Sequence, residues 1–160
     1  MASKRVMKEL DAYRRDPSQA VVQLYPPNED DLLSMKAVMR GPDDTDYQDG
    51  TFVLALSIPP SYPSAPPAIR FETRCAHPNV DLSTGAICLD LLQTRWTPAY
   101  GLVSALEAVH QLLAHGGEAD SPLNLDLARM VREGDVVGAR AVVRWATRVF
   151  ARGDGSARAG

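Results

Sequence analysis

The sequence predicts an α+β domain, in which an N-terminal helix is followed by a four-stranded antiparallel meander sheet, an irregular active-site segment and C-terminal helices. Three observations predict this fold class. Apolar residues recur with helical spacing near both ends of the chain. Four short β-rich stretches follow one another with turn signals between them. Their connections are too short for parallel strands, which need a long crossover, so helices and strands segregate along the chain.

The first element is a helix from Ser3 to about Asp16. Val6, Leu10 and Tyr13 recur at i, i+4 and i+7 and form one apolar stripe, while the other face is basic. The proline that follows Asp16 ends the helix, because the residue before a proline avoids the helical conformation.

Four strands follow, and turn residues separate them. The stretches are AVVQLY (20–25), LLSMKAVM (32–39), TFVLALSI (51–58) and AIRFE (68–72). Between the last two lies PPSYPSAPP (59–67), which is too rich in proline for a sheet and is expected to be a stiff surface connection. Its Tyr62-Pro63 bond is a candidate cis peptide.

The pattern becomes helical again after residue 101. One helix has an apolar face made of Leu102, Leu106, Val109 and Leu113, and Gly116-Gly117 ends it. A short helix is predicted over residues 124–133. The last helix has an apolar stripe made of Ala139, Val142, Val143, Ala146, Val149 and Phe150. We expect one domain over residues 1–152. Residues 153–160 show no periodicity and are expected to be a disordered tail.

Composition excludes several classes of function. The 160 residues carry a net charge of −3 and a pI near 5.6, so there is no basic footprint for nucleic acid or an anionic membrane. No apolar run approaches the length of a membrane span. Two cysteines without a signal peptide indicate a reducing compartment and free thiols.

The irregular segment between Phe71 and Leu102 is where function is expected, because long loops in compact domains are usually functional. It contains His77, Asn79 and Cys88. The apolar neighbours of Cys88 are compatible with a buried filler residue, since free cysteine is often buried. The alternative is that this thiol is a nucleophile.

Three chemistries are conceivable for these side chains. A Cys-His hydrolase would use His77 as base for Cys88, but no orienting third group is recognisable, and His77 fits a turn hydrogen bond better. A metal site from Cys75, His77 and Cys88 has only three ligands and no paired spacing, so none is expected. A thioester carrier needs only the thiol and an oxyanion donor, for which Asn79, across a turn at Gly85, is suitable.

Five motifs, in order, resemble the ubiquitin-conjugating enzymes from about Lys4 to Arg152. They are GPDDTDYQDGTF (41–52), SYPSAPP (61–67), HPN (77–79), GAICLDLL (85–92) and RWTPA (95–99). Because five motifs at the family's spacing are far more specific than any one, the chain is identified as a member of this family.

The resemblance implies catalytic roles. Cys88 receives the ubiquitin C-terminus, and Asn79 either stabilises the oxyanion or braces the loop beside the thiol. Asp90 either helps to deprotonate or orient the incoming amine or is a solvated surface acid. Ser121 occupies the position where many relatives carry an acid that tunes the attacking lysine.

The remaining site residues follow from the same resemblance. His77, Pro78, Gly85 and Trp96 are expected to be structural, and Lys4, Arg5, Lys8, Tyr62, Pro63, Ser64, Pro98 and Ala99 are expected to bind partners. Many relatives that bind ligases carry a bulky aromatic residue in place of Ser64, so the resemblance does not imply that ligases in general bind here.

The resemblance implies no bound cofactor. The ubiquitin thioester is a co-substrate, and the activating enzyme uses the ATP. The expected partners are ubiquitin, the activating enzyme and a ligase, with no nucleic acid and no direct membrane insertion.

Two features resemble the peroxisomal ubiquitin-conjugating peroxin: one extra residue between Asn79 and Cys88, and the stretch SPLNLDLARMVREGD (121–135). That resemblance implies a RING-type ligase of the peroxisomal membrane, a membrane-anchored peroxin tether and the peroxisomal import receptor as substrate. The protein would then be cytosolic and peripheral on the cytosolic face of the peroxisomal membrane.

Two alternatives remain. The chain could be a general cytosolic ubiquitin-conjugating enzyme with other substrates, or a non-catalytic ubiquitin-binding module of the same fold. Such modules lack the signature cysteine, so Cys88 argues against the second.

Overall fold

The elements follow one another in the predicted order in the computed structural model, which describes residues 1–116 and 122–153. The helices are α1 (Ala2–Arg15), α2 (Leu102–His115), α3 (Leu125–Arg132) and α4 (Val136–Phe150), with one 3-10 turn, η1 (Asp90–Leu92); the strands are β1 (Val21–Tyr25), β2 (Ser34–Arg40), β3 (Thr51–Ser57) and β4 (Ala68–Phe71). All the strand pairs are antiparallel and the sheet order is β1-β2-β3-β4. The predicted meander is confirmed.

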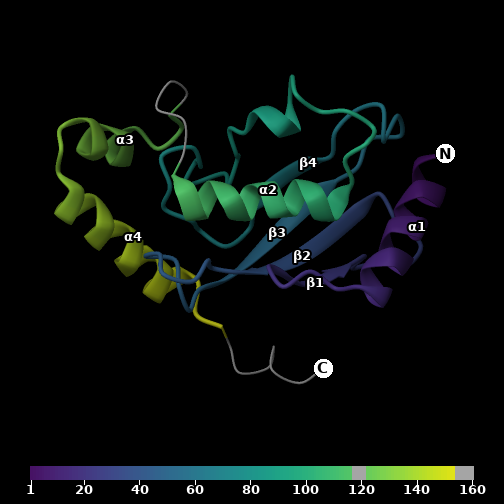
Figure 1. The fold of residues 1–160 in the computed structure, drawn as a ribbon, viewed down its shortest axis with the longest axis horizontal. Helices are drawn as coiled ribbons and strands as arrows, with labels where there is room; N and C mark the ends of the chain where they lie inside the picture. Colours follow the sequence, from purple (N-terminus) through teal and green to yellow (C-terminus); the bar gives the residue numbers. More distant parts are fainter. Residues whose placement is uncertain (117–121, 154–160) are drawn as a thin grey trace.

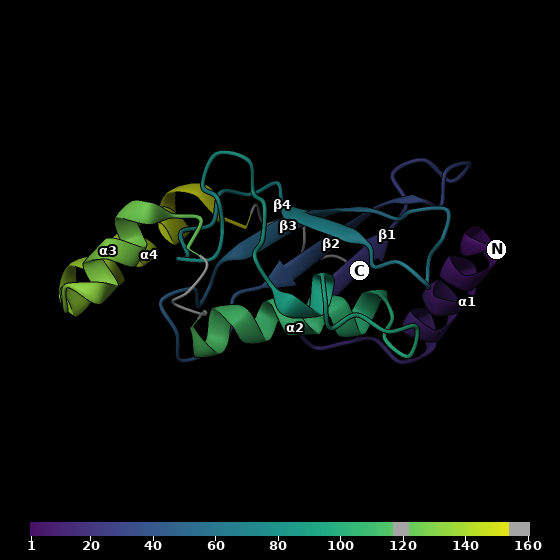
Figure 2. The same ribbon diagram turned by 90° about the horizontal axis from the view of Figure 1, so that it is seen from above.

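Helix α2 lies across one face of the sheet, α1 lies at one end, and α3 and α4 lie at the other end (Figures 1 and 2). Burial alternates along β3, because successive side chains of a strand point to opposite faces of the sheet. Phe52, Leu54 and Leu56 are buried, while Val53 and Ala55 on the other face are half-buried, so one face is covered more completely than the other. The predicted stripes of the first and second helices are buried, namely Val6, Leu10 and Tyr13 in α1 and Leu102, Leu106, Val109 and Leu113 in α2. Each such side chain contributes on the order of 2 kcal/mol to folding.

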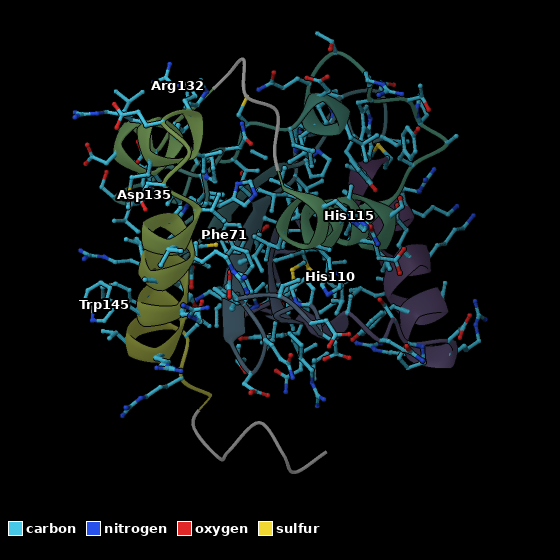
Figure 3. The ribbon with its side chains drawn as sticks, turned by 60° about the vertical axis from the view of Figure 1, so that its left-hand side comes forward. Phe71, His110, His115, Arg132, Asp135 and Trp145 are labelled. Carbon is cyan, nitrogen blue, oxygen red and sulfur yellow. The ribbon has the colours of Figure 1, made fainter. Side chains whose placement is uncertain are left out.

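The last helix differs from the predicted stripe. Ala139 and Val143 are buried, but Val142 and Val149 are 38% and 49% exposed. Helix α4 packs mainly against α3, so neighbours cover a narrower strip than helical spacing alone suggests. Trp145 is 59% exposed and points away from the sheet in Figure 3.

The connections carry the turn signals that the sequence shows. The Tyr62-Pro63 bond in the proline-rich connection is cis. Gly116 follows α2 with a φ of 76° and a ψ of 173°, an extended conformation with positive φ that glycine alone adopts readily.

A tight turn at Gly85 brings the central segment onto the end of β4. The Phe71 N–H donates to the Gly85 carbonyl at 2.9 Å, and the Gly85 N–H donates to the Asp81 carbonyl at 2.8 Å. Gly85 has a φ of 76°, and a Cβ there would lie 1.8 Å from the Phe71 carbonyl oxygen. No other residue type fits without moving the backbone.

We therefore expect Gly85→Ala to lower the free energy of unfolding by about 2 kcal/mol or more, from the left-handed strain and the clash together. Gly134 is the matched control, because its φ is 80° but nothing lies within 4 Å of where a Cβ would be. Urea unfolding of both alanine variants measures the difference. Equal losses at the two positions would contradict the close approach at Gly85.

Candidate active site

A short antiparallel pairing within the central segment holds Cys88 opposite Asn79. Val80 bridges to Ile87, and the Cys88 N–H donates to the Asn79 carbonyl at 2.9 Å. The Cys88 side chain is partly exposed, whereas Asn79 is 1% exposed. Cys88 is thus partly accessible, while the backbone beside it is held by this pairing.

His77 fastens this pairing to helix α2. Its Nδ1 accepts a hydrogen bond from the Asn79 N–H at 3.0 Å, so the ring proton lies on Nε2, which donates to the Leu112 carbonyl at 3.0 Å. Burial lowers the pKa of His77 to about 4, so the ring is neutral at neutral pH. Both ring nitrogens serve the backbone, and the arrangement does not support His77 as a base for Cys88.

Two further contacts fix the same segment from either side. The Pro78 carbonyl accepts from the Leu123 N–H at 2.8 Å and the Asn124 N–H at 3.1 Å, at the start of α3. The Asn124 side chain caps α3 by accepting from the Leu127 N–H. On the other side, the buried Tyr47 hydroxyl donates to the carbonyl of residue 76 at 2.7 Å. Sequence reasoning did not assign Asn124 or Tyr47 a role; Tyr47 lies inside the motif 41–52.

The second thiol has a different environment. Cys75 is 2% exposed, and burial raises the pKa of its thiol, which disfavours the nucleophilic thiolate. No group of three or more His, Cys, Asp or Glu side chains that could hold a metal occurs in the described part of the chain. His77 could ligate a metal only by giving up a backbone hydrogen bond.

Of the two remaining candidate residues, Asp90 and Ser121, the structure describes only Asp90. Asp90 opens η1 two residues after Cys88 and is half-buried. Its carbonyl accepts from the Gln93 and Arg95 N–H groups at 3.0 Å each, which shapes the turn beyond the thiol. Ser121 lies outside the described residues.

At the α1 end, Glu9 joins three segments. Its carboxylate accepts from Arg5 Nε at 2.7 Å, from the Tyr62 hydroxyl at 2.5 Å and from the Leu102 N–H at 2.7 Å. Burial, and then the hydrogen bond to Glu9, raise the pKa of Tyr62. Charge-assisted hydrogen bonds of this kind are stronger than neutral ones. The sequence offered no signal for Glu9 beyond its i+4 spacing from Arg5.

Three of the predicted partner-binding residues, Arg5, Tyr62 and Pro98, belong to this group of contacts around Glu9, the Glu9 cluster. Arg5 also donates to the Pro98 and Tyr100 carbonyls, at 3.2 and 3.0 Å, and Trp96 Nε1 donates to the Pro63 carbonyl at 2.8 Å. A specific contact thus fixes the Trp96 indole. Of the remaining residues, Lys4, Lys8, Ser64, Pro98 and Ala99 are exposed, Pro63 is half-buried and Tyr62 is buried. Their contact with partners stays a prediction.

One family of known proteins matches most of the chain. The family described as "Ubiquitin-conjugating enzyme" matches residues 5–145. The chain belongs to the ubiquitin-conjugating enzyme family. "Ubiquitin-conjugating enzyme E2 pex4" of Dictyostelium discoideum is 42% identical over 146 residues, which cover 91% of this chain and 97% of that protein. "Ubiquitin-conjugating enzyme E2 PEX4" of Gibberella zeae is 44% identical over 145 residues, covering 89% and 84%.

A solved structure agrees with these relatives. The H. polymorpha ubiquitin-conjugating enzyme Pex4p, crystallised in complex with the soluble domain of Pex22p, matches with a TM-score of 0.87 and 33% identity, covering 93% of this chain and 97% of that one. The predicted family and fold are confirmed, and the protein is a ubiquitin-conjugating enzyme of the Pex4 type. Within residues 1–116 and 122–153, no helix is long and apolar enough to cross a membrane.

The depressed pKa of His77 predicts a pH dependence of stability. Its pKa falls from 6.5 to about 4 on folding, so the unfolded chain binds more protons between these values and stability falls as the pH drops through this window. We expect wild type to lose about 2 kcal/mol more than His77→Gln between pH 7 and pH 5, by urea unfolding. His115→Gln, which changes an exposed histidine at the end of α2, is the control and should keep the wild-type loss. If His77→Gln loses as much as wild type, His77 is not buried neutral.

Proposed function

We propose that this ubiquitin-conjugating enzyme carries ubiquitin as a thioester on Cys88. The observation that supports this most directly is the contrast between the two thiols: Cys88 is partly exposed on a fixed backbone, whereas Cys75 is buried. The Cys88 thiolate attacks the carbonyl carbon of the thioester that joins ubiquitin to the activating enzyme. The new C–S bond forms as the old one breaks, and the activating enzyme's cysteine leaves as a thiolate.

In the second step an acceptor nucleophile attacks the Cys88 thioester. A tetrahedral oxyanion forms and then collapses, releasing the Cys88 thiolate, while the proton of the acceptor passes to water. Asn79 acts beside the thiol, either by stabilising this oxyanion or by bracing the loop. Asp90, two residues beyond Cys88, orients the acceptor. His77 takes no part in proton transfer, because both its ring nitrogens are engaged.

The acceptor that suits this site best is a cysteine. Ser121 supplies no carboxylate where many relatives carry an acid that tunes a lysine. A thiol deprotonates near neutral pH far more readily than an ammonium group does, so it needs less help. We propose that the reaction needs no cofactor on this chain and that the activating enzyme consumes the ATP.

A charging reaction with activating enzyme, ATP and ubiquitin tests this proposal. We expect a thiol-sensitive adduct on wild type, resolved on a non-reducing gel. Cys88→Ser should give no adduct or a thiol-resistant ester, because the serine oxygen forms an oxyester in place of the thioester. Cys75→Ala is the matched control and should charge like wild type. A thiol-sensitive adduct that survives in Cys88→Ser, or is lost in folded Cys75→Ala, would assign the reaction elsewhere.

We further propose that the enzyme acts at the cytosolic face of the peroxisomal membrane and modifies the peroxisomal import receptor for its recycling. The names of the Pex4 relatives support this, and the complex of H. polymorpha Pex4p with Pex22p supports a partner that tethers the enzyme. The surface around the Glu9 cluster would bind the activating enzyme and a RING-type ligase of that membrane.

Complementation separates this role from that of a general cytosolic ubiquitin-conjugating enzyme. In D. discoideum cells that lack their own pex4, we expect this chain to restore ubiquitin on the import receptor, measured by immunoprecipitation. Cys88→Ser is the control and should restore none. A chain that is expressed and charges with ubiquitin but leaves the receptor unmodified would favour the general enzyme.

A further inference from the structure

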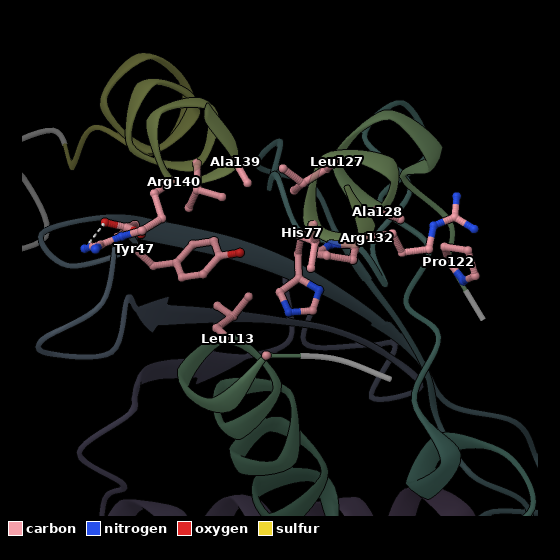
Figure 4. A pocket seen from close by; sticks show the side chains of 14 residues that line it. Tyr47, His77, Leu113, Pro122, Leu127, Ala128, Arg132, Ala139 and Arg140 are labelled. Carbon is pink, nitrogen blue, oxygen red and sulfur yellow. Dashed lines mark hydrogen bonds and ion pairs between the residues drawn. The ribbon is translucent and has the colours of Figure 1, made fainter. Parts of the chain in front are cut away.

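A cavity of about 310 Å³ lies between the C-terminal end of α2, helices α3 and α4, and the His77-Pro78 segment (Figure 4). Side chains from these four parts and from the connection between β2 and β3 form its wall. The residues that line it include Tyr47, His77, Leu113, Leu127, Ala139 and Val143. The volume lies at the lower end of the range typical of small-molecule sites.

The polar groups of the wall are already engaged. The Tyr47 hydroxyl donates to a backbone carbonyl, and both ring nitrogens of His77 bind the backbone. Arg140 pairs with Asp46 at 2.9 Å. A ligand inside the cavity therefore meets aliphatic and aromatic surface, including the Tyr47 and His77 rings, whose centroids lie 6.2 Å apart.

One cation at the rim is open. Arg132 lies at the end of the cavity beside Pro122, away from Tyr47 (Figure 4). Its side chain makes no hydrogen bond or ion pair within residues 1–116 and 122–153, in contrast to Arg129 on the same helix, which pairs with Glu133 at 3.1 Å. An apolar interior with a single free guanidinium at its mouth selects ligands with an apolar body and one negative charge.

We propose that this cavity binds a small organic anion, with an aromatic or aliphatic body against Tyr47, His77 and Leu113 and its carboxylate or sulfonate on Arg132. Two hydrogen bonds connect a ligand in the cavity to the backbone of Cys88. The His77 ring in the wall accepts from the Asn79 N–H, and the Asn79 carbonyl accepts from the Cys88 N–H. The ligand thereby alters the rate at which the Cys88 thioester discharges, a consequence that rests on the proposed function.

The binding itself is tested on the uncharged full chain with 8-anilinonaphthalene-1-sulfonate, an aromatic anion of the required chemistry. We expect one saturable site by fluorescence titration. Ala139→Phe fills the cavity and should weaken the affinity at least tenfold, and Arg132→Gln should weaken it about threefold to tenfold. Arg129→Gln is the matched control and should bind like wild type. If Ala139→Phe does not fold, as judged by its thermal transition, the smaller Ala128→Val replaces it and should weaken binding at least threefold.

Val137, which is 80% exposed on α4 and outside the cavity, distinguishes the alternative of surface binding. Val137→Ser should leave the titration unchanged. Absence of saturable binding, or binding that Val137→Ser removes and the cavity-filling variant does not, overturns the proposal.

The coupling is tested on the preformed ubiquitin thioester. Saturating probe should change the rate of discharge to free cysteine at least twofold in wild type and leave it unchanged in Ala139→Phe. An unchanged rate in wild type with the site saturated overturns the coupling. Failure to form a thioester at all would contradict the proposed function, but the titration of the uncharged chain would still decide the binding site.

Discussion

The neutral imidazole of His77 is the interaction on which the site depends. One ring joins the carbonyl of Leu112 in α2 to the N–H of Asn79, whose own carbonyl holds the N–H of Cys88. A protonated ring could not accept at Nδ1, so charging His77 would break the contact to Asn79. Burial of the ring, which disfavours the charged form, therefore also keeps the thiol in place.

The rest of the fold supports this arrangement from three directions. Helix α2 packs across the sheet and thereby fixes the position of the Leu112 carbonyl that His77 binds. Gly85 allows the chain to pass close to the end of β4. The start of α3 holds the Pro78 carbonyl through two N–H groups. At the α1 end of the molecule Glu9 also joins distant segments, because its half-buried carboxylate accepts hydrogen bonds from donors in three segments. Around His77 and around Glu9, a few specific hydrogen bonds offset the conformational entropy that the loops lose when they become ordered.

Local patterns predicted the fold, and distant contacts could not be predicted. Alternation and helical spacing report which residues face the core, so α1, α2 and the four strands followed from the sequence. The stripe of α4 was partly wrong at Val142 and Val149, since periodicity does not say how much of a helix its neighbours cover. A turn hydrogen bond was expected for His77, and its Nδ1 accepts from the Asn79 N–H, but its second partner, the Leu112 carbonyl, lies 35 residues away. The apolar neighbours of Cys88 favoured burial, and only the order of motifs along the chain pointed to a nucleophile.

The tautomer and charge of His77 are measured most directly by the ¹⁵N and ¹H shifts of its ring between pH 8 and pH 5. We predict a neutral ring with its proton on Nε2 throughout this range, because its pKa lies near 4. A ring that carries its proton on Nδ1, or that gains a second proton near pH 6.5 while the protein stays folded, would contradict the central role given to His77.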